Sequence, residues 1–134
     1  MRQGIQDDFP DSMLQEYGCY FFCLLEWSER ITDEPVMDRE IIPIFDYCLS
    51  KGWIEEDCFI INPVAILNHC IGRNVFRSVC KSGEMPKEGI CVVYIKRPGH
   101  GHFVLEEDGE RWDSMNPNRP AAALYSVDSY RLFS

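Results

Sequence analysis

Apolar residues recur at helical spacing in the first half of the chain. Between about Glu16 and Ile31 they return with a period near 3.6 residues, which predicts an amphipathic helix. The same pattern predicts a second helix from about Asp38 to Ser50. Asn62 followed by Pro63 indicates the start of a third helix, because asparagine caps helix N-termini and proline suits the first helical position. Gly72 indicates the end of that helix.

The second half of the chain is rich in Val, Ile, Tyr and Phe, which are typical of strands. Asp108-Gly109 is a strong signal for a two-residue hairpin turn between two of the expected strands. Helices followed by strands indicate an α+β fold, with N-terminal helices packed on a C-terminal antiparallel sheet. The expected strands are residues 74–81, 90–96, 102–107, 110–116 and 126–133.

Composition and charge narrow the class of protein. A chain of 134 residues that is 46% hydrophobic fits a single domain, residues 1–134, with a real core. The formal net charge of −9 makes nucleic acid and anionic lipid improbable partners, since both are negatively charged. No apolar run approaches the roughly 18 residues that cross a bilayer, and the first residues lack a signal-peptide pattern. We expect a soluble cytoplasmic protein with no nucleic acid and no membrane partner.

Seven cysteines are present, an odd number in a chain with enough apolar residues to fold without disulfides. We therefore expect reduced thiols. Four of them lie in apolar runs and are expected to be small buried side chains: Cys48, Cys70, Cys80 and Cys91.

A glycine followed by a cysteine lies near the start of the first predicted helix. Gly18 lets the backbone turn tightly, so that Cys19 falls in the first helical turn. The unpaired N–H groups and the positive end of the helix dipole stabilise a thiolate there. Cys23, between Phe22 and Leu24, lies one turn further and is expected to belong to the core. Cys19 is therefore the candidate nucleophile.

The predicted hairpin brings a histidine and a carboxylate together. A two-residue turn at Asp108-Gly109 pairs Glu107 with Glu110, which fixes the register of both strands. His102 and Asp113 then lie on one face as diagonal neighbours, within side-chain reach. A carboxylate that holds an imidazole orients the base of a nucleophile–base–orienter set.

Two alternatives remain open at this point. His100 lies on the same face as His102, one pair further away and between glycines, so it suits a mobile rim of the cleft where it touches substrate. The base is then either His102, which the register favours, or His100. A zinc site formed by Cys19, Cys23 and both histidines is a second hypothesis, and it requires both cysteines to face the hairpin.

These motifs resemble the papain-like cysteine peptidase superfamily. The resemblance rests on Gly18-Cys19 at the start of an apolar helix, on the strand Gly101 to Leu105, and on Asp113 in the next strand, followed by a proline. Among the branches of the superfamily, the chain is most similar to small bacterial ones. These include peptidases that cleave double-glycine leader peptides and an uncharacterised bacterial and phage family.

The resemblance implies a papain-like fold and a thiol hydrolase, a cysteine peptidase or amidase, that needs no cofactor and acts on a peptide or amide. Cys19 would be the nucleophile, His102 the general base and acid, and Asp113 the orienting residue. Gln15 would line the oxyanion hole with the backbone N–H of Cys19, although the family commonly has its glutamine about six positions before the cysteine rather than four. The alternatives are a catalytically inactive papain-like binding or regulatory module and a small metal-binding α+β domain.

Overall fold

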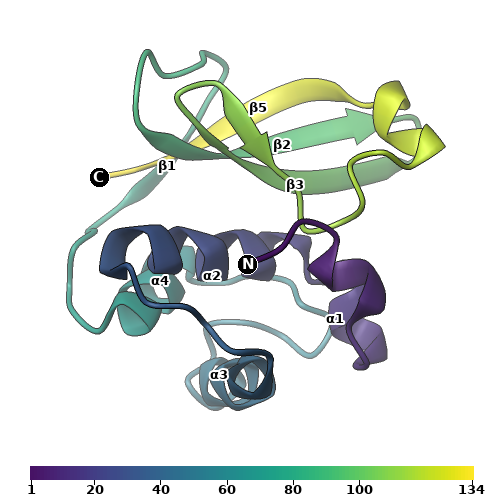
Figure 1. The fold of residues 1–134 in the computed structure, drawn as a ribbon. Coiled ribbons are helices and arrows are strands. Elements are labelled where there is room, and N and C mark those ends of the chain that lie inside the picture. Colours follow the sequence, from purple (N-terminus) through teal and green to yellow (C-terminus); the bar gives the residue numbers. More distant parts are fainter.

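The computed structural model describes all residues from 1 to 134. It consists of four α-helices, two short 3-10 helices and one five-stranded sheet, which confirms the predicted α+β class (Figure 1). The elements, in chain order, are η1 (Ile5–Asp8), α1 (Ser12–Tyr17), α2 (Cys19–Thr32), α3 (Asp38–Ser50), α4 (Pro63–Ile71), β1 (Val79–Ser82), β2 (Ile90–Arg97), β3 (His100–Glu107), β4 (Glu110–Trp112), η2 (Pro120–Leu124) and β5 (Ser126–Phe133).

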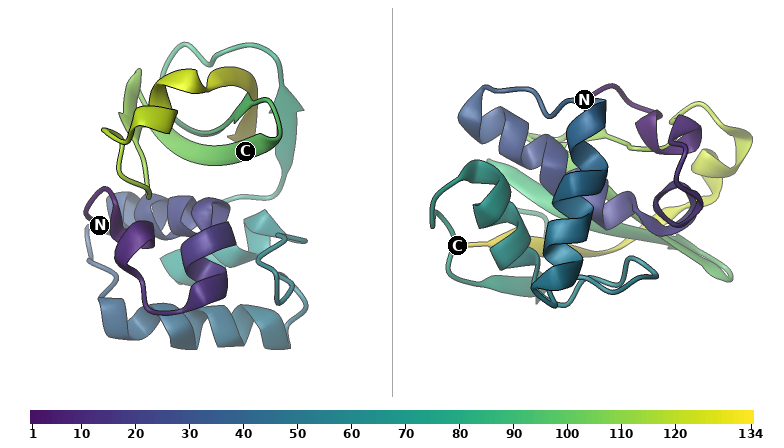
Figure 2. Two further views of the ribbon diagram at one scale, coloured as in Figure 1. Left: turned by 90° about the vertical axis from the view of Figure 1, so that its right-hand side faces the viewer. Right: turned by 90° about the horizontal axis from the view of Figure 1, so that it is seen from below.

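Helix α2 is the centre of the molecule. It lies directly beneath the sheet, with α4 beside it and α3 below, and the views from the side and from below agree on this layering (Figures 1 and 2). Its side chains from Phe21 to Leu25 are fully buried in the main core. The sheet contributes Val92, Leu105 and Trp112 to that core. The first residue of this central helix is Cys19, so the core fixes the position of the candidate nucleophile.

The helices follow the predicted signals with one difference. Helix α3 has the predicted bounds, and α4 begins at Pro63 after an Asn62 cap whose side chain accepts from Ala65 N. The first predicted helix, however, is divided at Gly18 into α1 and α2. The reason is a separate cap: the Asp11 side chain accepts from the N–H groups of Met13 and Leu14 and starts a short helix before Gly18.

The sheet is antiparallel in the order β1-β5-β2-β3-β4. Glu107 pairs with Glu110 across the Asp108-Gly109 turn, so the predicted hairpin register is confirmed. Three strand boundaries were predicted wrongly by two residues or more. Residues 74–78 form no strand, because the Asn68 side chain takes the N–H groups of Val75 and Phe76.

The other two corrections lie beside the candidate site. Strand β3 begins at His100, which pairs with Arg97 across a Pro98-Gly99 turn, and not at His102. Strand β4 ends at Trp112 instead of residue 116. It stops because the Asp113 side chain accepts from Met115 N, which bends the chain away from the ladder. The part of β3 before Leu105 therefore has no strand on its β4 side.

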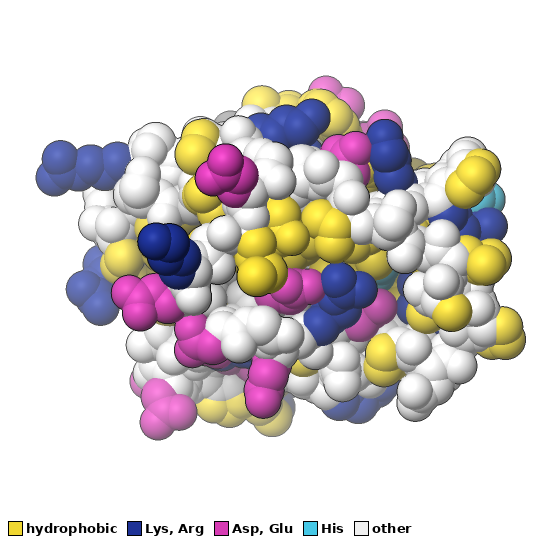
Figure 3. Space-filling model, turned by 90° about the horizontal axis from the view of Figure 1, so that it is seen from above, with side chains coloured by type: hydrophobic (Ala, Val, Ile, Leu, Met, Phe, Trp, Pro, Cys, Tyr) yellow, Lys and Arg dark blue, Asp and Glu magenta, His cyan; other side chains and the backbone are white.

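The outer face of the sheet carries a second, smaller core of Cys91, Val93, Ile95, Val104 and Tyr130. Seen from above, this side of the molecule shows hydrophobic side chains in the middle and charged side chains of both signs around them (Figure 3). No helix is long and apolar enough to cross a bilayer.

All seven cysteines are free. Cys48 and Cys91 are buried as expected and Cys70 is half-buried, but Cys80 is exposed. The expectation for Cys80 was wrong because it lies in β1, which is an edge strand with solvent on one side.

Candidate active site

The candidate site lies where α2 begins, at the uncovered edge of β3. Cys19 is the first residue of α2, and no side chain caps that helix, so its first-turn N–H groups are not taken by a neighbouring side chain. Gly18 is required there because a Cβ atom would lie 2.5 Å from the carbonyl oxygen of Leu14. The sequence argument for Cys19 therefore agrees with its position in the fold.

His102 and Asp113 form a buried pair. The distance between His102 Nε2 and Asp113 Oδ1 is 2.6 Å, and the His102 side chain is only 2% exposed. The pair forms although β4 ends before Asp113, because the register up to Trp112 already directs the next residue towards His102. The expected neighbourhood of these two residues is therefore present.

Cys19 is the second polar neighbour of the His102 ring. Burial lowers the pKa of His102, but hydrogen bonds to Asp113 and Cys19 and the charges of both outweigh burial and raise the pKa to about 9. Since Nε2 is held by Asp113, the nitrogen left for Cys19 is Nδ1. The three predicted residues thus converge in the order thiol, imidazole and carboxylate.

Asp113 is held on both of its oxygens. Oδ1 also accepts from Met115 N at 2.9 Å, and Arg119 Nη1 lies 3.4 Å from Oδ2. Burial raises the pKa of Asp113, but the hydrogen bond and charge of His102, the Met115 N–H and the charge of Arg119 lower it below the usual value. Asp113 is therefore an ionised carboxylate that keeps His102 protonated at neutral pH.

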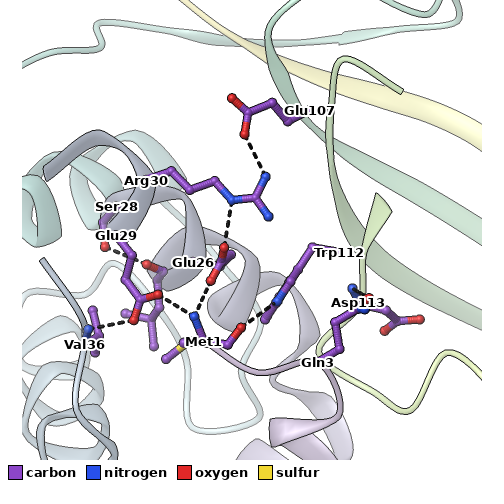
Figure 4. Close-up of polar contacts among 11 residues, drawn as sticks. Met1, Gln3, Glu26, Ser28, Glu29, Arg30, Val36, Glu107, Trp112 and Asp113 are labelled. Atoms are coloured by element: carbon purple, nitrogen blue, oxygen red, sulfur yellow. Dashed lines mark hydrogen bonds and ion pairs between the residues drawn. The ribbon is translucent and has the colours of Figure 1, made fainter. Parts of the chain in front are cut away.

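The N-terminal segment braces the chain next to Asp113 (Figure 4). Gln3 Oε1 accepts from Asp113 N at 3.0 Å, and the Met1 carbonyl accepts from Trp112 Nε1 at 2.9 Å. The Met1 amino group is bound by Glu26 and Glu29, both on α2. The segment therefore ties the end of β4 to the same helix that carries Cys19.

Two glutamines near Cys19 have structural partners. Gln6 is fully buried: its Oε1 accepts from Ser114 Oγ at 2.6 Å, and its Nε2 donates to the carbonyl of Gln15. The side chain of Gln15, the residue predicted for the oxyanion hole, is exposed and donates to the carbonyl of Asp7 at 2.7 Å. The structure therefore turns the Gln15 amide nitrogen towards η1, and its role at the oxyanion stays a prediction.

The four residues of the zinc hypothesis do not converge. Cys23 is fully buried in the main core, and His100 is exposed at the start of β3. His102 already has Asp113 on one nitrogen and Cys19 on the other side. No group of three or more His, Cys, Asp or Glu side chains has a geometry that could hold a metal ion.

An aromatic ring between two arginines lies behind the histidine. The ring of Tyr125 is 6.1 Å from that of His102, with the guanidinium groups of Arg97 and Arg119 at 5.5 and 5.9 Å. The sequence analysis missed Tyr125, Arg119 and the bracing glutamines. Only Arg119 has a local signal, because it follows the turn-forming residues Asn116-Pro117-Asn118, which begin three positions after Asp113.

A groove of about 540 Å³ opens beside Cys19. Its walls come from the end of α1, the start of α2, the loop between α3 and α4, and strands β2, β3 and β5. A larger hollow of about 880 Å³ lies next to α4 and shares no lining residue with this groove. We place the site at the smaller groove, because it is the one that contains a nucleophilic side chain with a base beside it.

The chain belongs to the DUF261 family, described as a protein family of unknown function, because the family model matches residues 4–134. No curated protein and no solved structure matches the chain.

Proposed function

We propose that this DUF261 protein is a thiol hydrolase that cleaves a peptide or amide bond with Cys19 as nucleophile, His102 as general base and acid, and Asp113 as the orienting residue. One observation carries the proposal: a cysteine in the first turn of a helix shares a buried histidine with an ionised aspartate. A purely structural histidine needs no thiol on its second nitrogen.

The chemistry follows from the charges. An imidazolium held by Asp113 is the partner that stabilises a thiolate at neutral pH, and the thiolate attacks the carbonyl carbon of the substrate. His102 then gives its proton to the leaving amine, and the acyl-enzyme forms. His102 then takes a proton from a water molecule, whose oxygen attacks the thioester carbon. The carboxylic acid leaves, and the thiolate of Cys19 and the imidazolium of His102 are restored.

The oxyanion that forms in each step needs donors. The uncapped start of α2 offers the backbone N–H of Cys19, and one such donor contributes roughly 2.7–4 kcal/mol in comparable sites. Gln15 supplies a second donor in this proposal, and to do so its amide must leave the carbonyl of Asp7. If it does not leave, the site retains one donor, which favours the second candidate, a binding or regulatory module without turnover.

The proposal includes a papain-like fold in the cytoplasm. It is supported by the helix that begins with Cys19, by the antiparallel sheet that follows it in the chain, and by seven cysteines that are all free. The similarity of these motifs to small bacterial papain-like peptidases points the same way.

Acylation with p-nitrophenyl acetate tests the proposed function. We expect a burst of nitrophenol, followed by steady turnover, and an acetyl group on the peptide that contains Cys19. Cys19→Ala should lose both the burst and the turnover. Cys23→Ala is the matched control and should keep both, since Cys23 lies in the core.

The results of this experiment distinguish the thiol hydrolase from the binding or regulatory module. A burst on Cys19 without turnover would favour the binding or regulatory module. Acetylation of Cys80 alone, the exposed thiol in β1, would refute a special reactivity of Cys19 and with it the proposed hydrolase.

A further inference from the structure

The floor of the groove beside Cys19 is a row of three packed aromatic rings. Tyr20 stacks on Phe103 with 4.3 Å between ring centres, and Phe103 packs against Tyr94 at 4.8 Å. Phe59, in the loop between α3 and α4, lines the same groove and is 63% exposed. Eight of the twelve lining residues are hydrophobic, so the groove suits an apolar side chain.

The backbone of β3 keeps this floor flat. A Cβ atom on Gly101 would lie 1.9 Å from the hydroxyl oxygen of Tyr94, so the ring of Tyr94 lies across the position that a side chain would fill. Both residues line the groove. Residue 101, directly before His102, is therefore glycine, because any side chain there would collide with the Tyr94 ring in the floor of the groove.

Two carboxylates and one guanidinium group line the groove. Glu16 and Asp57 line it from α1 and from the loop between α3 and α4. Tyr17 lines the groove with them, and the hydrogen bond and charge of Glu16, with desolvation and the charge of Asp57, raise the pKa of Tyr17. Arg131 lines the groove from β5, where it lies over the rings of Tyr94 and Phe103.

We infer that the groove binds a peptide segment that places an aromatic or aliphatic side chain on the aromatic floor and a positively charged group between Glu16 and Asp57. The inference rests on the proposed function, because it assigns the substrate class of the same site. Charge complementarity carries it: the groove is lined by two carboxylates and one guanidinium group, and the net charge of −9 strengthens the attraction for a cation.

Charged thiol reagents test the inference without any turnover. Cys19 is labelled with 2-aminoethyl methanethiosulfonate, a cation, and with 2-sulfonatoethyl methanethiosulfonate, an anion. The rate with the cationic reagent divided by the rate with the anionic reagent should be about threefold or more higher at Cys19 than at the exposed Cys80. Glu16→Gln with Asp57→Asn should bring the two ratios together.

The matched control removes the same charge elsewhere. Asp33→Asn with Glu34→Gln alters two exposed carboxylates at the far end of α2 and should leave the ratio at Cys19 unchanged. Equal ratios at Cys19 and Cys80 in the unaltered protein, or an equal effect of both double variants, would overturn the inference.

Hydrolysis of two acetyl-dipeptide coumarin amides, one with Phe and Lys and one with Phe and Glu, gives the second measurement. We expect a higher kcat/KM for the lysine substrate and a smaller difference in the double variant of Glu16 and Asp57. Hydrolysis of both at equal rates would overturn the inference and leave the proposed function intact. Charge-selective labelling without hydrolysis would leave the groove preference intact and count against the hydrolase.

Discussion

At the scale of single residues, the site depends on one histidine with two different neighbours. His102 is buried between Asp113 and Cys19, whereas His100, two residues earlier, is exposed and pairs only through its backbone with Arg97. The two histidines therefore provide a comparison within one strand, in which sequence distance is small and environment differs completely.

His102→Ala is expected to slow the alkylation of Cys19 by iodoacetamide about tenfold or more at neutral pH, because the proposed function assigns His102 as the group that takes the thiol proton. His100→Ala should change the rate less than about twofold. Mass-spectrometric mapping of the labelled peptide measures both rates.

Asp113→Ala should fall between the two histidine variants, since it removes the carboxylate and leaves the imidazole. Cys58 serves as an internal control, because it lines the same groove while burial raises its pKa to about 11. Equal loss of Cys19 labelling in both histidine variants, or faster labelling of Cys58 than of Cys19, would contradict the assignment of His102 as the base.

At the scale of secondary-structure elements, the break between α1 and α2 sets the position of Cys19. Gly18 N donates to the Leu14 carbonyl and Gly18 O accepts from Phe22 N, so the two helices meet with no room for a side chain. The close approach, rather than an unusual backbone angle, explains the glycine, because its φ of −81° is open to any residue.

Gly18→Ala is therefore expected to lower the free energy of unfolding by about 1–3 kcal/mol, as overpacking against a fully buried residue does. The alkylation of Cys19 should slow as well, because the start of α2 must shift. Urea unfolding measures the first effect and labelling the second.

Gly83→Ala is the matched control. A Cβ atom there meets nothing within 4 Å, so the free energy of unfolding should change by no more than about 0.5 kcal/mol. If Gly18→Ala were equally harmless, the junction would not be the packed element described above.

Sequence signals at this scale predicted most of what forms the site. Gly18 placed Cys19 at a helix start, and Asp108-Gly109 fixed the register that brings His102 to Asp113. The early end of β4 was not predicted, because it depends on a hydrogen bond from the backbone N–H of Met115 to the side chain of Asp113, which replaces a bond within the sheet.

The bracing contacts were beyond prediction for a different reason. Gln3 and Gln6 bind residues that are 110 and 108 positions away in the chain. A glutamine buried by such a contact carries no local pattern, since its partner is defined only by the folded chain. The Gln15 prediction was drawn from family resemblance, and the local hydrogen bond to Asp7 could not be foreseen from spacing.

At the scale of the whole molecule, the charge state of His102 links the site to stability. In the folded protein the imidazole of His102 keeps its proton up to about pH 9, whereas in the unfolded chain the same imidazole loses it near the ordinary pKa of 6.5. The folded state therefore binds more protons in this window, and the free energy of unfolding must fall as the pH rises through it. The full effect of His102 is about 3 kcal/mol at most.

Urea unfolding of the unaltered protein and of His102→Gln, between about pH 6 and about pH 9, measures that effect. The difference between the two curves should shrink as the pH rises. The comparison is needed because the raised pKa of the Met1 amino group, which Glu26 and Glu29 bind, adds a loss of the same sign in both proteins. Parallel curves would show that His102 is not protonated in the folded protein at neutral pH.

The contacts that Gln3 and Gln6 make beyond the end of β4 also determine when the site can form during synthesis of the chain. Asp113, which Gln3 holds, and Ser114, which Gln6 holds, are synthesised roughly 5–20 s after Cys19 at about 5–20 residues per second. Until then the thiol has neither its imidazole nor its carboxylate. In the proposed function, Cys19 therefore becomes reactive only when these two distant segments of the chain meet.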